Sequence, residues 1–558
     1  MVFSTPLATL ITLSTLITFA SAVTIQKPLL QLPADAAQNR QTVKEMFLYS
    51  YNAYKNDAWG HDDVTPISQG FADDRNGWGA TIIDSLSTMY IMGLDDLFQD
   101  GVGFASNVSF TKSRTNDTVS VFETTIRYLA GLLSAYELSN SKYPALLTKA
   151  TEIADTLSHA WVGANAIPYG HMNPDNSPIV QVSNIAEAGS LSLEWYTLSK
   201  YTYNPIYAKL GVGSARQIAT QPHPLPGLAA QGIDPSTGTP VGDYVTWGGG
   251  SDSYFEYLIK YARLSNTFDS LWAQEWATAV DSSINLLSSR SGVGDWLYLA
   301  DWYGGGTKRL IGSHLACFNA GNIIYGGKLL NNQTIVEFGL ELNEGCWNTY
   351  ASSPTGIGPE TFGWKTSGGN FSGPALTSEQ ETYYQKNGYY PESTDYYLRP
   401  EVLESNFYAW RVTGDQKYQT RAASAMTSFQ KYLRIPTGGY AGIWDVTMPD
   451  AISYIDTTES FWYAEVLKYL YLTFDDPYRI SLDDWVFNTE AHPFKAPPAK
   501  STYNEGVSSP TPTVPFTVQQ DVPVAQISPC PALGDLLTKV ITDVVFGAVE
   551  NLLEGLVL

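Results

Sequence analysis

Charged residues are scarce in this chain, and basic residues are scarcer than acidic ones. Only 16% of the 558 residues are charged, and 32 Lys and Arg stand against 55 Asp and Glu, for a formal net charge of −23. A protein that binds nucleic acid needs a basic surface to contact phosphate groups. The composition therefore argues against a nucleic-acid partner, and the negative charge is expected mainly to favour solubility outside the cell.

Cysteine is rare as well, and the three residues are Cys317, Cys346 and Cys530. No Cys/His spacing matches a zinc site. Cys317 and Cys346 could close one loop, which would stabilise the fold by roughly 3 kcal/mol on the chain-entropy account. The odd number leaves the pairing open, and Cys530 is either a free thiol or an intermolecular bridge.

Several common binding motifs are missing. The chain has no EF-hand, no glycine loop that cradles phosphate, no dinucleotide fingerprint and no Gly-x-Ser-x-Gly elbow. It also lacks an Asp-rich magnesium motif, because its acidic pairs are isolated. We expect these pairs to be solvated: Asp62-Asp63, Asp73-Asp74 and Asp95-Asp96.

Long apolar runs are missing from the chain except near its start. Residues 6–20 are apolar and end in Ala20-Ser21-Ala22, a small-x-small cleavage signature. The run is short for a membrane span, so residues 1–22 are predicted to be a cleaved signal peptide and the mature chain to have no spanning segment. An uncleaved Golgi-type anchor is the alternative.

Four glycosylation sequons, at Asn107, Asn116, Asn332 and Asn370, agree with passage through the secretory pathway. We therefore expect a secreted glycoprotein, with the Golgi or vesicular lumen as the alternative location.

Aromatic residues, by contrast, are plentiful at 13%, with 15 Trp and 36 Tyr. They suit a large apolar core and also a cleft in which rings pack against sugars. A pattern of an acidic or polar head followed by an aromatic-rich apolar helix recurs seven times. We expect an all-α toroid of seven helical hairpins, whose inner segments are 84–94, 121–139, 184–200, 251–265, 314–330, 399–414 and 457–474.

A ring of hairpins would gather the helix heads at one end, where long connections (165–183, 220–250 and 351–397) would build walls. Most heads carry a carboxylate. A cluster of carboxylates in one pocket favours acid–base chemistry on a sugar, cation binding, or both. The carboxylates are Asp84, Glu123, Glu187, Asp252, Glu401, Glu404 and Glu459.

The domain organisation follows from composition. Residues 23–495 show no break that would divide them into two domains. Residues 496–531 are rich in Pro, Ser and Thr and are predicted to be a linker. Residues 532–558 have the pattern of an amphipathic helix, suited to docking or self-association rather than to membrane attachment.

The head segments leave alternatives open when they are taken singly. Glu123 and Arg127 share a helix face in apolar surroundings, as in a buried ion pair or a general acid beside a cation. Asp252 follows three glycines and a serine and is favoured as a helix cap. Glu401 and Glu404 lie on one helix face after Arg399, so their carboxylates repel each other. Either a cation, water or substrate hydroxyls lie between them, or this helix start is simply solvated.

Taken together, these segments resemble the class I α-1,2-mannosidases of glycoside hydrolase family 47. The resemblance runs in order over nearly all of residues 41–495, so it is specific although each motif alone is weak. The motifs are AYKNDAWGHDDVTPIS, GWGATIIDSLSTMYIMGL, VFETTIRYLAGLLSAY, IAEAGSLSLEW, DSYFEYL, HLACF, YYLRPEVLESNFYAWR, TTESFWYAEVLKYLYL and VFNTEAHPF.

The resemblance implies an (αα)7 barrel that removes terminal α-1,2-linked mannose from high-mannose N-glycans, with inversion and one bound calcium. It implies that Glu123 is the proton donor acting through water, with Asp252 as the other acid proposed for that role. Glu401 would be the base that activates water, and Thr489 the direct protein ligand of calcium.

Further residues are implied to line or support the sugar pocket: Arg127, Glu187, His314, Arg399, Glu404, Phe461, Glu465 and Glu490. The resemblance also implies a disulfide between Cys317 and Cys346.

One departure from the family pattern bears on specificity. Gly250 stands where members that stop after one mannose carry Arg, which favours the broader, secreted fungal type. Two alternatives are a glycan-binding relative without activity and another α-toroid enzyme, such as a glucan hydrolase or a terpenoid cyclase.

Overall fold

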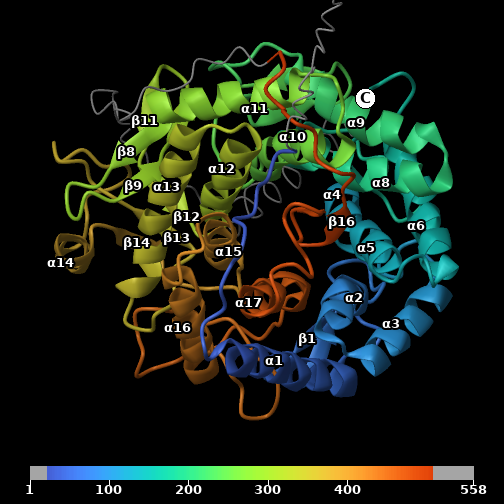
Figure 1. The fold of residues 1–558 in the computed structure, drawn as a ribbon, viewed down its shortest axis with the longest axis horizontal. Helices are drawn as coiled ribbons and strands as arrows, with labels where there is room; N and C mark the ends of the chain where they lie inside the picture. Colours follow the sequence, from blue (N-terminus) through green and yellow to red (C-terminus); the bar gives the residue numbers. More distant parts are fainter. Residues whose placement is uncertain (1–21, 507–558) are drawn as a thin grey trace, which may run out of the picture.

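The computed structural model describes residues 22–506, which form a ring of helices in two layers (Figure 1). Successive inner helices pack against one another, and α17 packs back against α2 to close the ring. The inner helices are α2 (Ala80–Met92), α5 (Ala130–Leu138), α8 (Ser192–Thr202), α10 (Asp252–Ser265), α12 (Phe318–Leu329), α15 (Glu401–Thr413) and α17 (Leu467–Phe474). The predicted toroid of seven helical pairs is confirmed.

Six of the inner helices pair with the outer helix that follows them in the chain. The outer helices are α3 (Asp95–Asn107), α6 (Pro144–Leu157), α9 (Pro205–Ala219), α11 (Leu271–Ser282), α13 (Gln333–Ala351) and α16 (Lys417–Tyr432). The seventh pair is different, because α17 packs against α1 (Ala36–Asp57) from the other end of the chain.

Burial explains why the two layers differ in sequence. Every residue of α2 except Tyr90 is buried, whereas α3 buries only Phe98, Gly101, Val102 and Ala105 on one face. A helix covered on all sides buries every face, and its polar residues need hydrogen-bond partners, whereas a helix covered on one side needs only an apolar stripe.

Close approach between inner helices requires small side chains at some contacts. A Cβ atom on Gly131 of α5 would lie 2.6 Å from the Ile83 carbonyl oxygen of α2, so only glycine fits there.

Short irregular helices complete the ring, and three of them are π-helical. They are η1 (Thr124–Leu129), η3 (Ser283–Leu287) and η5 (Trp462–Val466). The remaining short elements are α4 (Val121–Glu123), α7 (Ile185–Gly189), α14 (Ser378–Asn387), η2 (Ser158–Ala160) and η4 (Leu315–Cys317). Such π-turns often occur at functional sites, and η1 and η5 lie at the heads of two inner helices.

The long connections contain small antiparallel sheets. The strand pairs are β1–β2 (Asp63–Thr65, Gly70–Ala72), β3–β4 (Val119–Ser120, His171–Met172), β8–β9 (Ser288–Arg290, Leu297–Leu299) and β10–β11 (Asp301–Tyr303, Thr307–Arg309). The three-stranded sheets are β5–β6–β7 (Ser183–Asn184, Gly232–Asp234, Thr239–Val241) and β12–β13–β14 (Ile311–Ser313, Thr361–Gly363, Tyr390–Ser393).

The last hairpin, β15 (Trp485–Phe487) and β16 (Pro493–Lys495), lies inside the ring, where Figure 1 shows it in red. Strand β15 packs against α10, and β16 packs against α5. The turn between these strands, residues 488–492, is therefore surrounded by inner helices.

One sequence-based expectation about the acidic pairs is wrong. Asp62 and Asp63 are 0% and 1% exposed, not solvated. Asp62 is buried because backbone N–H groups of residues 75, 77, 79 and 80 converge on its carboxylate. The Asp95-Asp96 pair is exposed at the start of α3, as expected.

Some predictions fall outside the described residues. These are nearly all of the signal peptide, most of the linker, the tail helix and Cys530. Within residues 22–506, no helix is both long and apolar enough to cross a membrane.

Candidate active site

A cavity of about 1200 Å³ lies at the end of the ring where the inner helices begin. All but one of the predicted catalytic, sugar-binding and metal-binding residues line it. The lining residues are Glu123, Arg127, Glu187, Asp252, Arg399, Glu401, Glu404, Phe461, Glu465, Thr489 and Glu490. The exception is His314, which is buried behind Glu401.

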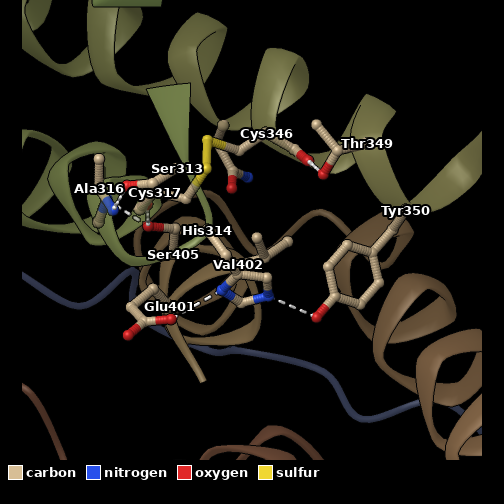
Figure 2. Close-up of a disulfide and its surroundings, with 12 residues drawn as sticks. Ser313, His314, Ala316, Cys317, Cys346, Thr349, Tyr350, Glu401, Val402 and Ser405 are labelled. Atoms are coloured by element: carbon tan, nitrogen blue, oxygen red, sulfur yellow. Dashed lines mark hydrogen bonds and ion pairs between the residues drawn. A yellow bond between two sulfur atoms is a disulfide. The ribbon is translucent and has the colours of Figure 1, made fainter. Parts of the chain in front are cut away.

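Glu401 begins α15 and is held from behind by His314 (Figure 2). His314 Nδ1 lies 2.7 Å from Glu401 Oε2, and His314 Nε2 lies 2.7 Å from the Tyr350 hydroxyl. An ionised carboxylate only accepts hydrogen bonds, so the His314 Nδ1–H donates to Glu401. Burial acts to raise the pKa of Glu401, but the bond from His314 and the charge of Arg399 hold it below its ordinary value.

The predicted disulfide between Cys317 and Cys346 is confirmed, and it ties η4 to α13 close to this histidine (Figure 2). The Cys317 backbone N–H donates to the His314 carbonyl at 3.0 Å, and the Ser405 hydroxyl of α15 donates to the Cys317 carbonyl at 2.6 Å. The cross-link thus fixes the segment that positions His314.

Replacing both cysteines with serine should lower the free energy of unfolding by roughly 3 kcal/mol, because the unfolded chain regains the entropy of a 29-residue loop. Urea denaturation of wild type and of the Cys317→Ser/Cys346→Ser variant measures the loss. Equal midpoints would mean that packing of α12 against α13 alone holds this loop.

Arg127 of η1 contacts three residues of the cavity and the buried Asp84 behind them. Its Nε donates to Glu123 Oε2 at 2.7 Å, its Nη1 pairs with Glu490 and lies 3.8 Å from Asp84, and its guanidinium lies over the Phe461 ring. The predicted Glu123–Arg127 pair is therefore real, with Arg127 buried and Glu123 partly open to the cavity. Burial acts to raise the pKa of Glu123, but the charges of Arg127 and Arg75 lower it.

The 488–492 turn is fixed by buried hydrogen bonds to four inner segments. The Asn488 amide donates to Glu194 Oε1 and to the Ile126 carbonyl, and the Lys468 ammonium donates to the Ala491 carbonyl. His492 bonds to Ser87 and, through Nε2, to Asp84 at 2.9 Å. Together these bonds hold Thr489 at the cavity.

Backbone strain accompanies this arrangement. Ala491 has φ 57° and Leu398 has φ 64°, values that residues with side chains rarely adopt. Such conformations cluster at functional sites, where the surrounding structure imposes them. Here Ala491 bends the turn that carries Thr489, and Leu398 bends the loop that leads into Arg399.

Asp252 is the first residue of α10, and the helix cap position belongs to Ser251 instead. Asp252 Oδ1 accepts from the Ser253 backbone N–H at 2.7 Å. Burial, with help from the charges of Glu256 and Glu401, raises the pKa of Asp252 to about 7. Its carboxyl group can therefore carry a proton near neutral pH.

Several charged residues of the cavity were missed as site residues in the sequence, among them Glu360, Arg75 and Glu459. Glu360 accepts from the Tyr397 backbone N–H at 3.1 Å and from Arg399 Nε at 2.5 Å. Arg75 lies 3.3 Å from Glu459 Oε2, an acid that the sequence placed at a helix head without a role. Glu360 and Arg75 occupy connections, which carry no helical repeat that could have revealed them.

Three further buried carboxyl groups line the same cavity as Thr489. Burial raises the pKa of Glu404, Glu465 and Glu490 well above the ordinary value. Neighbouring carboxylates add to the shift for each of them. These three groups therefore bind protons more readily than a free glutamate side chain does.

Comparisons with known proteins identify the family of this chain. Residues 46–496 match the profile of glycosyl hydrolase family 47. The chain is 38% identical to a mannosyl-oligosaccharide α-1,2-mannosidase 1B of Aspergillus phoenicis over 492 residues, which are 84% of this chain and 94% of the relative. It is also 38% identical to a mannosyl-oligosaccharide α-1,2-mannosidase of Coccidioides posadasii, with 82% and 91% of the two chains covered.

A solved structure shows the same fold. The α-1,2-mannosidase from Trichoderma reesei superposes with a TM-score of 0.79 at 36% identity, over 83% of this chain and 99% of that chain. The chain belongs to glycosyl hydrolase family 47.

Proposed function

We propose that this protein is a secreted, calcium-dependent α-1,2-mannosidase that removes terminal mannose from high-mannose N-glycans with inversion. The α-1,2-mannosidase names of its fungal relatives support the reaction and the substrate class. The N-terminal apolar run and the four sequons support secretion.

The observation that carries the mechanism is a pair of carboxyl groups with pKa values moved in opposite directions. Glu401 has a pKa below its ordinary value, whereas the pKa of Asp252 is raised to about 7. Near neutral pH, one group is therefore ionised and the other holds a proton. Titratable pairs of this kind supply the base and the acid of glycoside hydrolysis.

The reaction then needs one water molecule. The Glu401 carboxylate accepts a proton from this water, whose oxygen attacks the anomeric carbon from the face opposite the leaving oxygen. The glycosidic C–O bond breaks, and Asp252 gives its proton to the leaving oxygen. Room for the water between base and sugar requires the two carboxyl groups to be about 6.5–9.5 Å apart, which is the arrangement of inverting enzymes.

Glu123 has a different role in this scheme. Its pKa is held low by Arg127 and Arg75, so Glu123 is ionised at neutral pH and is a poor proton donor on its own. We infer that it binds sugar hydroxyls or passes a proton through water, while Asp252 stores the proton. This reverses the weight that the family resemblance gave to the two acids.

Thr489 would hold the calcium ion. Thr489 lines the same cavity as three buried glutamates, and its hydroxyl and carbonyl oxygens are of the kind that calcium binds. Residues 22–506 contain no cluster of three or more His, Cys, Asp or Glu that could hold a metal directly, so water and sugar hydroxyls would complete the ligand set. When bound, calcium would orient the hydroxyl groups of the sugar and offset the repulsion between carboxylates.

The test follows mannose release from a high-mannose N-glycan by proton NMR, with and without a calcium chelator. The expected result is release of β-mannose, which stops when the chelator is added and resumes when calcium is restored. Initial release of α-mannose would contradict inversion, and release that is indifferent to chelator would contradict the metal. Binding of glycan without release would favour the glycan-binding alternative.

The pH dependence of the rate follows from the two shifted carboxyl groups. Asp252 must be protonated to act, so kcat/KM should fall as pH rises through about 7. Glu401 must be ionised, so activity should persist as pH falls until its lowered pKa is reached. Rates measured across this range with Asp252→Asn and Glu123→Gln variants check the assignment.

Asp252→Asn should remove the fall at high pH along with most of the activity, and Glu123→Gln should keep the fall. The opposite pattern would identify Glu123 as the group that stores the proton.

A further inference from the structure

The cavity is larger than one sugar requires. Its volume of about 1200 Å³ exceeds the roughly 300–1,000 Å³ that usually encloses a whole small ligand. A mannose between Asp252 and Glu401 therefore leaves most of the space to other sugars of the same glycan. Their recognition depends on the walls and not on the acid and base.

One wall is formed by residues 393–397, which follow β14. Ser393, Asp395 and Tyr397 line the cavity there. Asp395 bonds to the Ser393 hydroxyl, and the Tyr397 backbone N–H donates to Glu360. This wall therefore presents a carboxylate and a phenol to the cavity, groups that can hydrogen-bond to sugar hydroxyls.

Trp444 extends this wall outward. Its ring meets the Tyr397 ring edge to face, with centroids 6.3 Å apart and an interplanar angle of 81°. Its side chain is nevertheless 51% exposed, although a ring of this size is expected to be largely buried in a stable fold. Single exposed hydrophobic residues are common, but Trp444 packs against a residue that itself lines the cavity.

The backbone of Trp444 is rigidly attached to the same wall. Ile443 and Tyr396 exchange both backbone hydrogen bonds, at 2.9 and 3.0 Å. The Thr394 hydroxyl donates to the Trp444 carbonyl, and the Trp444 N–H donates to the Ser453 carbonyl. The half-exposed ring therefore stands on a fixed support, and little conformational freedom is lost when a ligand packs on it.

We propose that Trp444, Tyr397 and Asp395 form a distal subsite that binds a sugar of the glycan remote from the bond being cleaved. The exposed indole face stacks on the apolar face of that sugar, and the Asp395 carboxylate and Tyr397 hydroxyl bind its hydroxyl groups. This inference rests on the proposed function. It makes Trp444 a determinant of preference for large glycans over short oligosaccharides.

The subsite is tested by comparing a high-mannose N-glycan with α-1,2-linked mannobiose, which has no further sugar to place at a distal subsite. Trp444→Ala should raise KM for the glycan by roughly three- to tenfold, the range expected for loss of one aromatic stacking contact, and should leave kcat and the mannobiose kinetics unchanged. Trp444→Phe should restore most of the affinity.

The matched control is Phe268→Ala. Phe268 is 92% exposed and follows the far end of α10, about 20 Å along that helix from Asp252. This change should alter neither substrate's kinetics. Unchanged KM for the glycan in Trp444→Ala, or an equal rise with both substrates, would overturn the subsite.

A binding measurement separates the subsite from the proposed reaction. Glycan is titrated by calorimetry into Glu401→Gln and into the Glu401→Gln/Trp444→Ala double variant. The two Kd values should differ by roughly three- to tenfold, the same factor as the KM values, although neither variant turns over. Equal Kd values would reject the subsite while mannose release by wild type stands. A difference in Kd with no release by wild type would reject the proposed function and retain the subsite.

Discussion

Glu401→Gln should fold, bind glycan and lose turnover by roughly 10²–10⁴-fold, the contribution of a general base. The amide has the size of the carboxylate, but it cannot accept a proton from the attacking water. The neighbouring His314 can still bond to the amide oxygen, so the head of α15 should keep its place. Mannose release measured by NMR and glycan affinity measured by calorimetry report the two effects separately.

The same substitution at Glu379 is the matched control, because that residue is exposed in the first turn of α14. It should change neither rate nor affinity. Wild-type turnover in Glu401→Gln would refute the assignment of the base. Loss of glycan binding together with turnover would instead place Glu401 in substrate binding.

Asp62→Ala is expected to have the largest effect on stability, at least about 4 kcal/mol in the free energy of unfolding. The carboxylate accepts backbone bonds from Arg75, Gly77, Gly79 and Ala80, the last at 3.1 Å. It also accepts a bond from the Tyr128 hydroxyl at 2.8 Å. Each buried donor left without an acceptor costs about 1–3 kcal/mol.

Urea denaturation of this variant should show the loss of stability. Activity should also fall, because the loop that loses its anchor is the one that places Arg75 at the cavity. Asp95→Ala is the control: Asp95 is exposed in the first turn of α3, where its favourable charge contributes about 0.3–1 kcal/mol. A similar small change at Asp62 would mean that water or neighbouring groups replace the lost carboxylate.

The sequence was sufficient to predict the inner ring and the residues of its heads. Most inner helices are buried along nearly their whole length, so their segments are rich in apolar and aromatic residues and the acid at each head is conspicuous. The positions of Glu123, Asp252 and Glu401 at one cavity follow from this repetition alone. The motif resemblance added Thr489, whose segment has no helical pattern.

Other features depend on contacts between distant residues and leave no local pattern. Asp62-Asp63 and Asp95-Asp96 look alike in sequence, yet a loop folds its amides around the first pair and not around the second. Glu360 and Arg75 reach the cavity from connections. The pairing of α1 with α17 joins opposite ends of the chain, so no periodicity could reveal it.

The position of the 488–492 turn determines when during synthesis the cavity can appear. Thr489 and Glu490 form part of its lining, and they come after all seven inner helices in the chain. A ribosome that has released only the first 480 residues has therefore produced a ring without its central residues. The earliest helix, α1, must also wait for α17 before it gains its partner. The cavity therefore gains its full lining only after residue 490 has been synthesised.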